Sequence, residues 1–411
     1  WRNGREVYQC TFKTLGNLKI PVKKVYTHFK EDLRPYGEIK YYVCNRRFTW
    51  VNCEPNTDFV RAESVFDLSS YSLFRTWVYP DTIRTVLFAK NGIDSIQNIT
   101  STEYGNVQHA MPTKITHNLS DGRVDTVLNF YPYDIVLTGS AETGRQSLIS
   151  KYMIGTVLKQ QTAKGSTTTN VLSKEYNLFS NGLTKNRSLS VQVLTNPPEK
   201  RIDFTKYNLF GKITEQFKTN DQKNSIIWDY KSMYPVANVN NADSSDIAYN
   251  SFEADGNGNW SFSGMATPDV TSPTGVNCYL ISQRLIKTGL NTSTTYIVSY
   301  WAKAGSSVSV SGSPGIKQGK TIGSWTFFED SVKGVNSITI SGTGYVDEVR
   351  LYPSTAQMIT STYSPLVGIT SKCDADNKIT YYFYDGIGRL SYVKDQDGNI
   401  IKTLEYKYAQ N

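Results

Sequence analysis

The residues that most often carry acid–base or nucleophilic chemistry are few in this sequence, and they are scattered. The chain has three histidines, His28, His109 and His117. None lies in a motif with a nearby serine or cysteine nucleophile. The chain also contains no Gly-x-Ser-x-Gly, no phosphate-binding glycine loop and no His-Glu-x-x-His. These patterns give no support to a nucleophilic, phosphoryl-transfer or zinc-dependent enzyme.

Neighbouring carboxylates occur at Asp374/Asp376 and Asp395/Asp397. Both pairs fall in predicted turns, where aspartate is favoured because its side chain accepts hydrogen bonds from its own backbone. A glycosidase pair supplied by two distant strands would leave no local pattern. We therefore predict that the chain is not an enzyme.

The five cysteines are Cys10, Cys44, Cys53, Cys278 and Cys373. A hairpin would bring Cys44 opposite Cys53, which allows a disulfide in an oxidising compartment. The other three have no near partner in the sequence and are predicted to be free thiols. No Cys-x-x-Cys or Cys/His cluster indicates zinc.

The formal net charge is +8, from 44 basic and 36 acidic residues that are spread along the chain. A nucleic-acid-binding protein would concentrate positive charge on one face, so no nucleic-acid partner is predicted. No apolar run is long enough for a transmembrane helix. The start at Trp1, without an initiator or a leader, suggests a piece of a longer protein.

The clearest structural pattern is the heptad YDGIGRL at residues 384–390, followed by DQDGN at 395–399. Glycine at each bend and alternation between the bends predict strand, turn, strand, turn and strand. Residues 207–213, YNLFGKI, repeat the heptad, and 226–230 is predicted to correspond to 402–406. A looser copy is predicted at 176–183. A hairpin of this size cannot bury its aromatic face alone, so it must join similar neighbours in a larger sheet.

The rest of the chain is also rich in predicted strands, with 28 tyrosines and 17 phenylalanines. Residues 1–66 form an N-terminal β-rich segment of unclear type, with strands near 7–12, 24–27 and 39–43. Residues 67–240 alternate apolar and polar residues between Asn-Gly and Asp-Gly bends, the antiparallel pattern. One amphipathic helix is predicted at 142–153, with Gly155 as its stop.

An Asn/Asp/Ser-rich linker at 238–245 marks a domain boundary. Residues 241–353 then show short serine- and glycine-rich strands without a helix, which predicts a β-sandwich or jelly roll. The repeat pattern resumes at 354–411. The fold class predicted is all-β, with a repeat sheet that is interrupted by the sandwich. The strands on either side of the interruption should therefore be neighbours in one sheet.

The 384–390 heptad with its 395–399 turn resembles a YD repeat of the Rhs family, in a form similar to large secreted or surface proteins of the Bacteroidota. Two upstream stretches, NFYPYD at 129–134 and WDYKSMYPVA at 228–237, resemble motifs of the same proteins. The resemblance implies an antiparallel sheet that spirals into a hollow shell. In relatives such a shell encloses a polymorphic toxin at its C-terminal end or forms a surface adhesin.

Residues 241–353 resemble a carbohydrate-binding-module-like jelly roll, on residues 250–253, 300–304 and 345–351. In such modules the first and last strands hold a structural calcium, and here Glu253 and Asp347 would supply carboxylate oxygens. Glycan binding needs an exposed aromatic surface, for which the candidates are Trp260, Trp301, Trp325 and Tyr345. The alternatives, solvated strand ends for the carboxylates and core packing for the rings, remain open.

Taken together, these resemblances imply a non-enzymatic, extracellular or cell-surface shell protein. Export across the outer membrane would make it a type IX secretion substrate, with secretion or surface-complex proteins as partners. Two alternatives remain: a glycan-binding adhesin acting through the jelly roll, and the carrier shell of a toxin whose payload follows residue 411.

Overall fold

The computed structural model describes residues 4–47 and 65–407. It divides the chain into an N-terminal unit, Trp1–Lys174 with Val191–Glu199, and a C-terminal unit, Glu175–Ser190 with Lys200–Asn411. The described residues form antiparallel β-structure with one α-helix, which confirms the predicted all-β class.

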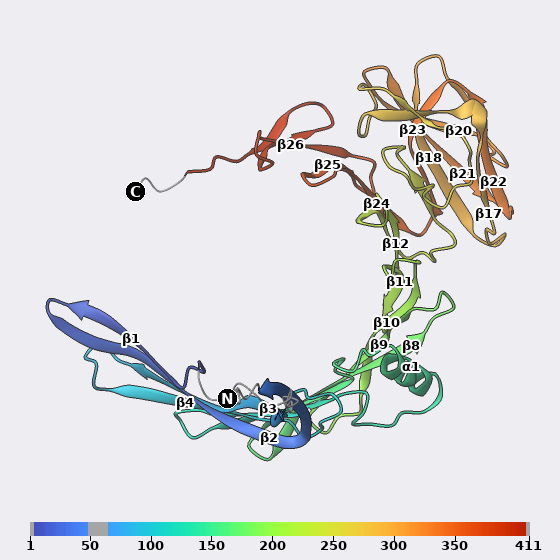
Figure 1. Cartoon of the computed structure of the whole chain (residues 1–411). Helices are drawn as coiled ribbons and strands as arrows, with labels where there is room; N and C mark the ends of the chain where they lie inside the picture. Colours follow the sequence, from blue (N-terminus) through green and yellow to red (C-terminus); the bar gives the residue numbers. More distant parts are fainter. Residues whose placement is uncertain (1–3, 48–64, 408–411) are drawn as a thin grey trace, which may run out of the picture. The chain divides into compact units, whose positions relative to one another are not determined.

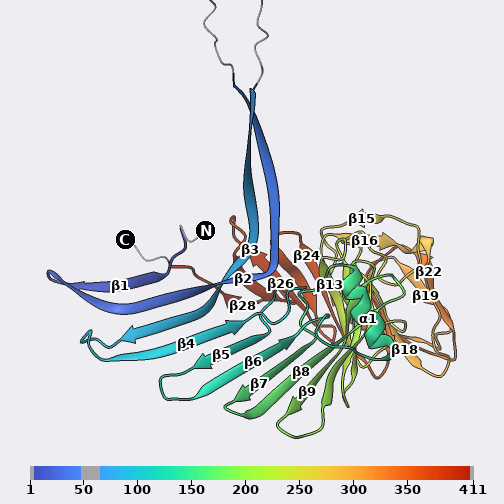
Figure 2. The same ribbon diagram turned by 60° about the horizontal axis from the view of Figure 1, so that its bottom comes forward.

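The N-terminal unit is an antiparallel meander in which each strand pairs with the next, as Figure 2 shows for β4 to β7. Its strands are β1 (Tyr8–Leu15), β2 (Leu18–Arg47), β3 (Val65–Phe88), β4 (Ser95–Glu103), β5 (Lys114–Asn118), β6 (Val124–Phe130), β7 (Lys159–Lys164) and most of β8 (Thr167–Leu178). The two strands predicted near 24–27 and 39–43 are both part of β2. The boundary predicted at 66/67 falls inside β3, which pairs with β2 from Leu87 to Val65.

The helix α1 (Gly139–Ser150) lies three residues earlier than predicted. It ends because Tyr152 adopts a φ of 56°, and the Met153 N–H donates to the Leu148 carbonyl at 2.8 Å, as in a Schellman motif. Leu148 is fully buried, but Tyr152 is 88% exposed and does not continue the apolar face. Tyr152, rather than Gly155, is therefore the stop.

The C-terminal unit also contains an antiparallel meander. Its strands are most of β9 (Thr184–Val193), β10 (Glu199–Tyr207), β11 (Ile213–Lys218), β12 (Lys223–Asp229) and β13 (Tyr234–Asn240), then β24 (Gln357–Ser364), β25 (Gly368–Cys373), β26 (Ile379–Tyr384), β27 (Leu390–Asp395) and β28 (Ile400–Thr403). We call residues 241–356, between β13 and β24, the insert. The chain enters the insert from β13 and returns at β24 (Figure 1).

The strands that flank the insert are neighbours, as predicted. β13 pairs with β24 in antiparallel register, from Ala237 opposite Thr360 to Asn240 opposite Gln357. The sheet therefore runs past the insert without a break, and β24 is followed in order by β25, β26, β27 and β28.

The insert contains two antiparallel sheets that share one core. The larger has β14 (Ala248–Asn250), β15 (Ala266–Pro268), β16 (Asn277–Leu280), β18 (Thr295–Lys303), β20 (Ile316–Ile322), β21 (Trp325–Lys333) and β23 (Tyr345–Pro353); the smaller has β17 (Leu285–Thr288), β19 (Ser307–Val310) and β22 (Ser337–Thr343). A single 3₁₀ turn, Ile281–Gln283, is also described. Leu285 and Ile340 of the smaller sheet pack in one cluster with Val298 and Leu351 of the larger. Burial of these aliphatic side chains stabilises the pairing of the two sheets.

The repeat predicted from the two heptads is confirmed at the level of single hydrogen bonds. The Asp385 Oδ1 atom accepts from the backbone N–H groups of Ile387 and Arg389, at 3.1 and 2.9 Å. The Asn208 Oδ1 atom accepts in the same way from Phe210 and Lys212, at 3.0 Å each. The glycine three positions after the Asp or Asn takes a positive φ in both copies, 78° at Gly388 and 75° at Gly211. Both heptads thus form the same five-residue turn.

The same turn recurs at Asp374 and Asp395, whose carboxylates accept from the residues two and four positions later. The looser copy predicted at 176–183 is displaced. There the turn begins at Phe179, which takes the place of Asn208, and the Asn181 side chain accepts from the Leu183 N–H.

In the second half of the repeat, the predicted correspondence of residues 226–230 with 402–406 is wrong by two residues. The Trp228 indole N–H donates to the Ile213 carbonyl at 2.7 Å, and the Lys212 ammonium lies 5.3 Å from its ring centroid. The Tyr406 hydroxyl donates to the Leu390 carbonyl at 2.9 Å, with the Arg389 guanidinium 4.4 Å from its ring. Tyr406 therefore corresponds to Trp228, not to Tyr230.

Candidate functional site

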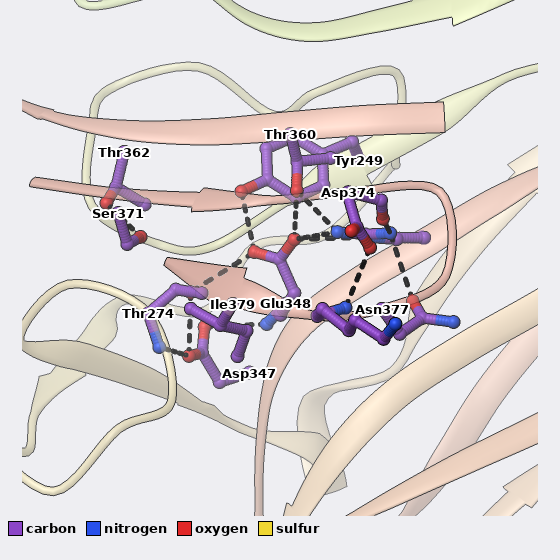
Figure 3. Close-up of polar contacts among 12 residues, drawn as sticks. Tyr249, Thr274, Asp347, Glu348, Thr360, Thr362, Ser371, Asp374, Asn377 and Ile379 are labelled. Atoms are coloured by element: carbon purple, nitrogen blue, oxygen red, sulfur yellow. Dashed lines mark hydrogen bonds and ion pairs between the residues drawn. The ribbon is translucent and has the colours of Figure 1, made fainter. Parts of the chain in front are cut away.

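A group of three buried charged residues lies where the insert joins the sheet. Asp347, Glu348 and Arg350 of β23 are each at most 2% exposed. We call these three residues, with the side chains that bind them, the root cluster (Figure 3). The cluster is assembled from β14, β23 and a loop at 273–276 in the insert, and from β24 and the β25–β26 turn in the sheet.

Glu348 is the centre of the cluster. Its Oε1 atom accepts from the Arg350 guanidinium at 2.8 and 3.0 Å and from the Thr360 hydroxyl. Its Oε2 atom accepts from the Tyr249 hydroxyl at 2.7 Å and contacts the Thr274 hydroxyl at 3.1 Å. A carboxylate with this many donors and a paired guanidinium satisfies the conditions for a buried ion pair.

Backbone geometry explains how two successive residues reach the same hydroxyl. In a regular strand, Asp347 and Glu348 would point to opposite faces. Instead, Glu348 has a φ of 52°, and the pairing of β18 with β23 shifts register between Ser299 and Trp301. This irregularity turns both carboxyl groups toward Thr274, whose Oγ1 lies 2.9 Å from Asp347 and 3.1 Å from Glu348.

Burial and neighbouring charges shift the pKa values of Asp347 and Arg350. Burial, followed by the charge of Glu348, raises the pKa of Asp347 well above its ordinary value, although the N–H groups of Thr274 and Glu348 oppose the shift. The shift favours the neutral form of the Asp347 carboxyl group. Burial alone would lower the pKa of Arg350, but Cys373 and Glu348 raise it above its ordinary value. The cluster thus combines the Arg350–Glu348 ion pair with a neighbouring carboxyl group whose neutral form is favoured by burial.

Arg350 carries the contacts from the insert into the sheet. Besides Glu348, its guanidinium donates to the Thr360 hydroxyl at 2.7 Å, and to the Asp374 carbonyl and the Asn377 side chain at 3.0 Å each. Nearby, the Tyr381 hydroxyl donates to the Pro273 carbonyl at 2.9 Å. The cluster is buried and its polar groups are bonded to other protein groups. Its role is therefore structural: it fixes the insert to the sheet, and we call this role a lock.

Sequence reasoning identified Asp347 but missed Glu348, Arg350 and the hydroxyl groups around them. A signal was present, because residues 345–351 place three charged side chains in an otherwise apolar strand. Charges are almost never fully buried unless they are paired. The partners come from distant positions in the chain, however, so they leave no pattern near β23.

The predicted calcium ligands take part in hydrogen bonds with a single loop. Glu253 accepts from the N–H groups of Val276 and Asn277, at 2.8 and 2.6 Å. Asp347 accepts from the Thr274 N–H at 2.9 Å. Calcium requires six to eight oxygen ligands, whereas these carboxylates face N–H donors. Among residues 4–47 and 65–407, no three His, Cys, Asp or Glu side chains gather to hold a metal ion. These contacts do not fit calcium, which stays a prediction without geometric support.

The predicted aromatic surface is wrong for its three tryptophans. Trp260, Trp301 and Trp325 are at most 3% exposed, and Tyr345 is half-buried. Trp301 and Trp325 pack in a cluster with Cys278 and Cys373, both buried free thiols. A sugar ring needs an exposed aromatic face, and these indoles serve as core instead. Trp301 lies between Tyr300 and Ala302, which are also buried, as is typical of a strand covered on both faces.

The histidines are not arranged as a catalytic site in the described residues. His109 is buried; its Nε2 lies 3.1 Å from the Asp134 carboxylate, and its Nδ1 accepts from the Met111 N–H at 3.0 Å. The ring therefore donates to Asp134 and braces a turn. His117 Nδ1 lies 3.0 Å from the Thr100 hydroxyl across two strands. His28 is exposed beside Asp81.

Of the predicted disulfide, Cys44 is an exposed free cysteine, and Cys53 lies outside the described residues. In the part of the chain that the structure describes, no helix combines the length and apolar character needed to span a bilayer.

No protein-family model and no curated protein matches the chain. Among solved structures, it is similar to a crystal structure of TcdB2-TccC3-TEV, with a TM-score of 0.30 and 8% identity over 91% of this chain. A crystal structure of TcdB2-TccC3 without its hypervariable C-terminal region gives a TM-score of 0.21 and 10% identity over 94% of this chain. A Photorhabdus luminescens Tc holotoxin pore gives 0.16 and 9% over 97%. This chain spans 24%, 23% and 20% of those chains, respectively. Likenesses at these TM-scores do not establish a shared fold.

Proposed function

We propose that this chain is a non-enzymatic wall segment of an extracellular Rhs/YD-repeat shell, and that the insert is a jelly-roll module carried by that wall. The observation that carries the proposal is the turn shared by Asn208, Asp374, Asp385 and Asp395, which recurs on both sides of the insert. Each repeat of this turn adds another antiparallel strand to the same sheet. A sheet that grows by repeats in this way can form the wall of a shell.

Side chains also connect one turn to the next. The Asn181 amide donates to the Asn208 carbonyl at 3.1 Å, and the Asn208 amide donates to the Ser232 hydroxyl at 3.1 Å. These bonds link the edges of three successive hairpins in the C-terminal unit. They fix the spacing of the hairpins along one edge of the sheet, which supports a structural role for the repeat.

The proposal places the protein on or outside a Bacteroidota-like cell, after export across the outer membrane by the type IX pathway, with secretion or surface-complex proteins as partners. The recurrent aromatic and Asp-Gly turns that resemble such proteins support this placement. The proposal is also compatible with the alternative in which the shell carries a toxin payload.

Two measurements on the protein encoded by the whole gene test the proposal. Electron microscopy of the purified protein is expected to show an enclosing β-wall, with the insert attached to it. Proteinase K added to intact cells of the native host is expected to remove the protein while a cytoplasmic marker survives. A solid particle without an enclosed volume, or complete protection in intact cells, would refute the wall or its location, respectively. Density inside the wall would assign the payload-carrying version.

A further inference from the structure

A cleft in the C-terminal unit lies between the 208–211 turn of the sheet and the 256–260 loop of the insert. It has a volume of about 530 Å³, within the range of pockets that hold small ligands. None of the described side chains that line it is ionisable; they are amides, hydroxyls and apolar groups. In contrast, a neighbouring cleft is lined by Asp221, Asp243, Asp246 and Lys223. The uncharged lining sets the first cleft apart.

One wall of the cleft is an exposed aromatic ring on a braced turn. Phe210 is 69% exposed, although it lies in a cleft. Its backbone N–H is held by the Asn208 side chain at 3.0 Å, and the Gly211 N–H donates to the Asn208 carbonyl at 2.9 Å. The turn therefore positions the ring, while the ring itself packs against no other aromatic group in the described residues.

The opposite wall is equally fixed. The Gly256 N–H donates to the Asp229 carboxylate at 2.7 Å, and the Tyr249 N–H donates to the Gly258 carbonyl at 2.8 Å. A Cβ at Gly258 would lie 1.5 Å from the Tyr249 carbonyl oxygen, so the loop approaches the strand as closely as only glycine allows. Asn257 is held between these two anchors, which fixes its position beside the cleft.

Several polar groups of the cleft have unused hydrogen-bonding capacity. The Trp260 side chain is 97% buried, since it is 3% exposed, and its indole N–H has no partner among the described residues. The side chains of Asn257 and Thr214 likewise make no hydrogen bond to another described residue. The Ser232 hydroxyl accepts from Asn208 and retains its own proton to donate. Of these groups only the Trp260 indole N–H is a buried donor without a partner, since Asn257 is exposed and Thr214 is half-buried. Buried donors in native proteins usually have partners, so the Trp260 indole N–H indicates a missing ligand.

We propose that this cleft binds a neutral saccharide. The C–H face of a sugar ring packs on an aromatic ring whose face carries partial negative charge, and Phe210 offers such a face. Sugar hydroxyls both donate and accept, which matches amides and hydroxyls in a fixed arrangement. A phosphate, carboxylate or ammonium ligand would instead require an opposite charge in the lining. The site goes beyond the proposed structural role, and it uses none of the buried surface of Trp301 or Trp325.

The test is isothermal titration calorimetry of the full chain with maltohexaose, cellohexaose, xylohexaose and N-acetylchitohexaose as probes, with inorganic phosphate as a charged comparison. At least one oligosaccharide is expected to bind, and phosphate is expected to give no heat. Phe210→Ala should weaken that binding roughly threefold to tenfold, the range for loss of one ring contact. Asn257→Ala should also weaken the binding, because it removes an amide that can bond to the sugar. The effect would not come from lost stability, since this side chain makes no hydrogen bond to another described residue.

The matched control is Phe12→Ala, which removes an equally simple aromatic side chain, 49% exposed, in the N-terminal unit. It should leave the affinity unchanged. Circular dichroism checks that each variant is folded. If Phe210→Ala does not fold, the affinity of Asn257→Ala tests the proposal instead. The proposal is overturned if none of the four oligosaccharides binds at millimolar concentration, if both cleft variants bind as the wild type does, or if phosphate competes. None of these results bears on the wall proposal, which rests on other residues.

Discussion

Replacing Arg350 by methionine tests whether the root cluster locks the insert to the sheet. The substitution keeps most of the side-chain volume and removes the charge together with contacts to Glu348, Thr360, Asp374 and Asn377. Glu348 would keep three hydroxyl neighbours but lose its counter-charge at 2% exposure. Removing one partner of a buried pair costs about 3–5 kcal/mol of folding free energy. The Asn377 side-chain carbonyl would lose its donor, whereas the Asp374 carbonyl would keep the Asn377 N–H, so one unpaired acceptor adds to this cost.

The assay is urea unfolding of the full chain, followed by tryptophan fluorescence. Three of the seven tryptophans, Trp260, Trp301 and Trp325, are buried in the insert, so its unfolding contributes to the signal. The control is Lys320→Met, which removes an ion pair to Asp397 whose side chains are 46% and 54% exposed. An exposed pair contributes about 0–1 kcal/mol, so the control should unfold near the wild-type midpoint.

A second variant separates the charge from the packing. Adding Glu348→Gln to Arg350→Met removes both charges, and the double variant should be more stable than the sum of the two single losses predicts. If Arg350→Met costs less than about 1 kcal/mol, the same as the exposed pair, the cluster is not a lock and the reasoning from burial is wrong.

Three further perturbations have defined outcomes. Gly258→Ala should destabilise the insert by at least about 2 kcal/mol in the same urea assay, because its φ of 58° and the Tyr249 carbonyl exclude a Cβ. Gly386→Ala is the control and should be neutral, because a Cβ there meets no atom within 4 Å. Asn208→Ala should cost about 1–2 kcal/mol through two lost turn bonds, while Asn208→Asp retains them; equal losses would contradict the shared-turn interpretation. Burial would raise the pKa of Glu215, but hydrogen bonds from Lys206, Ser244 and Thr205 lower it to about 2, so its contribution is present above pH 4.5 and is lost as the pH falls toward 2. Glu215→Gln should therefore remove up to about 3 kcal/mol at pH 7 and flatten the stability profile between pH 4.5 and 2; an unchanged slope would refute the assignment.

Local signals predicted the turns well and the sheet order in part. The Asp/Asn and glycine positions of residues 384–390 and 207–213 favour a bend with a side-chain acceptor at its start and a positive φ at the glycine, and both copies form it. The pairing of β13 with β24 followed from recognising one repeat on both sides of the insert. The correspondence of Tyr406 to Trp228 was missed because the two copies differ in length by one residue between turn and ring.

The site was less predictable, because its partners are brought together only by the fold. Asp347 was identified through a family pattern, but its environment depends on Thr274 and on the positive φ of Glu348, neither of which the strand sequence reveals. An alternating pattern also cannot tell whether Trp301 faces core or solvent. The helix ends three residues earlier than predicted because Tyr152 adopts the left-handed conformation, which sequence patterns usually reserve for glycine.

The pairing of β13 with β24 has a consequence for the order in which the chain folds. Asn240 and Gln357 meet only after the entire insert has closed a loop between them. The entropy lost by joining the ends of such a loop is large when the insert is a flexible chain. It falls once β14 has paired with β23, since Ala248 then lies opposite Leu351 and the two ends emerge side by side. We therefore expect the insert to collapse first and to act as the nucleus on which the two halves of the sheet join. Substitutions at Ala248 or Leu351 should then slow refolding of β24 to β28, whereas substitutions in β27 should mainly speed unfolding.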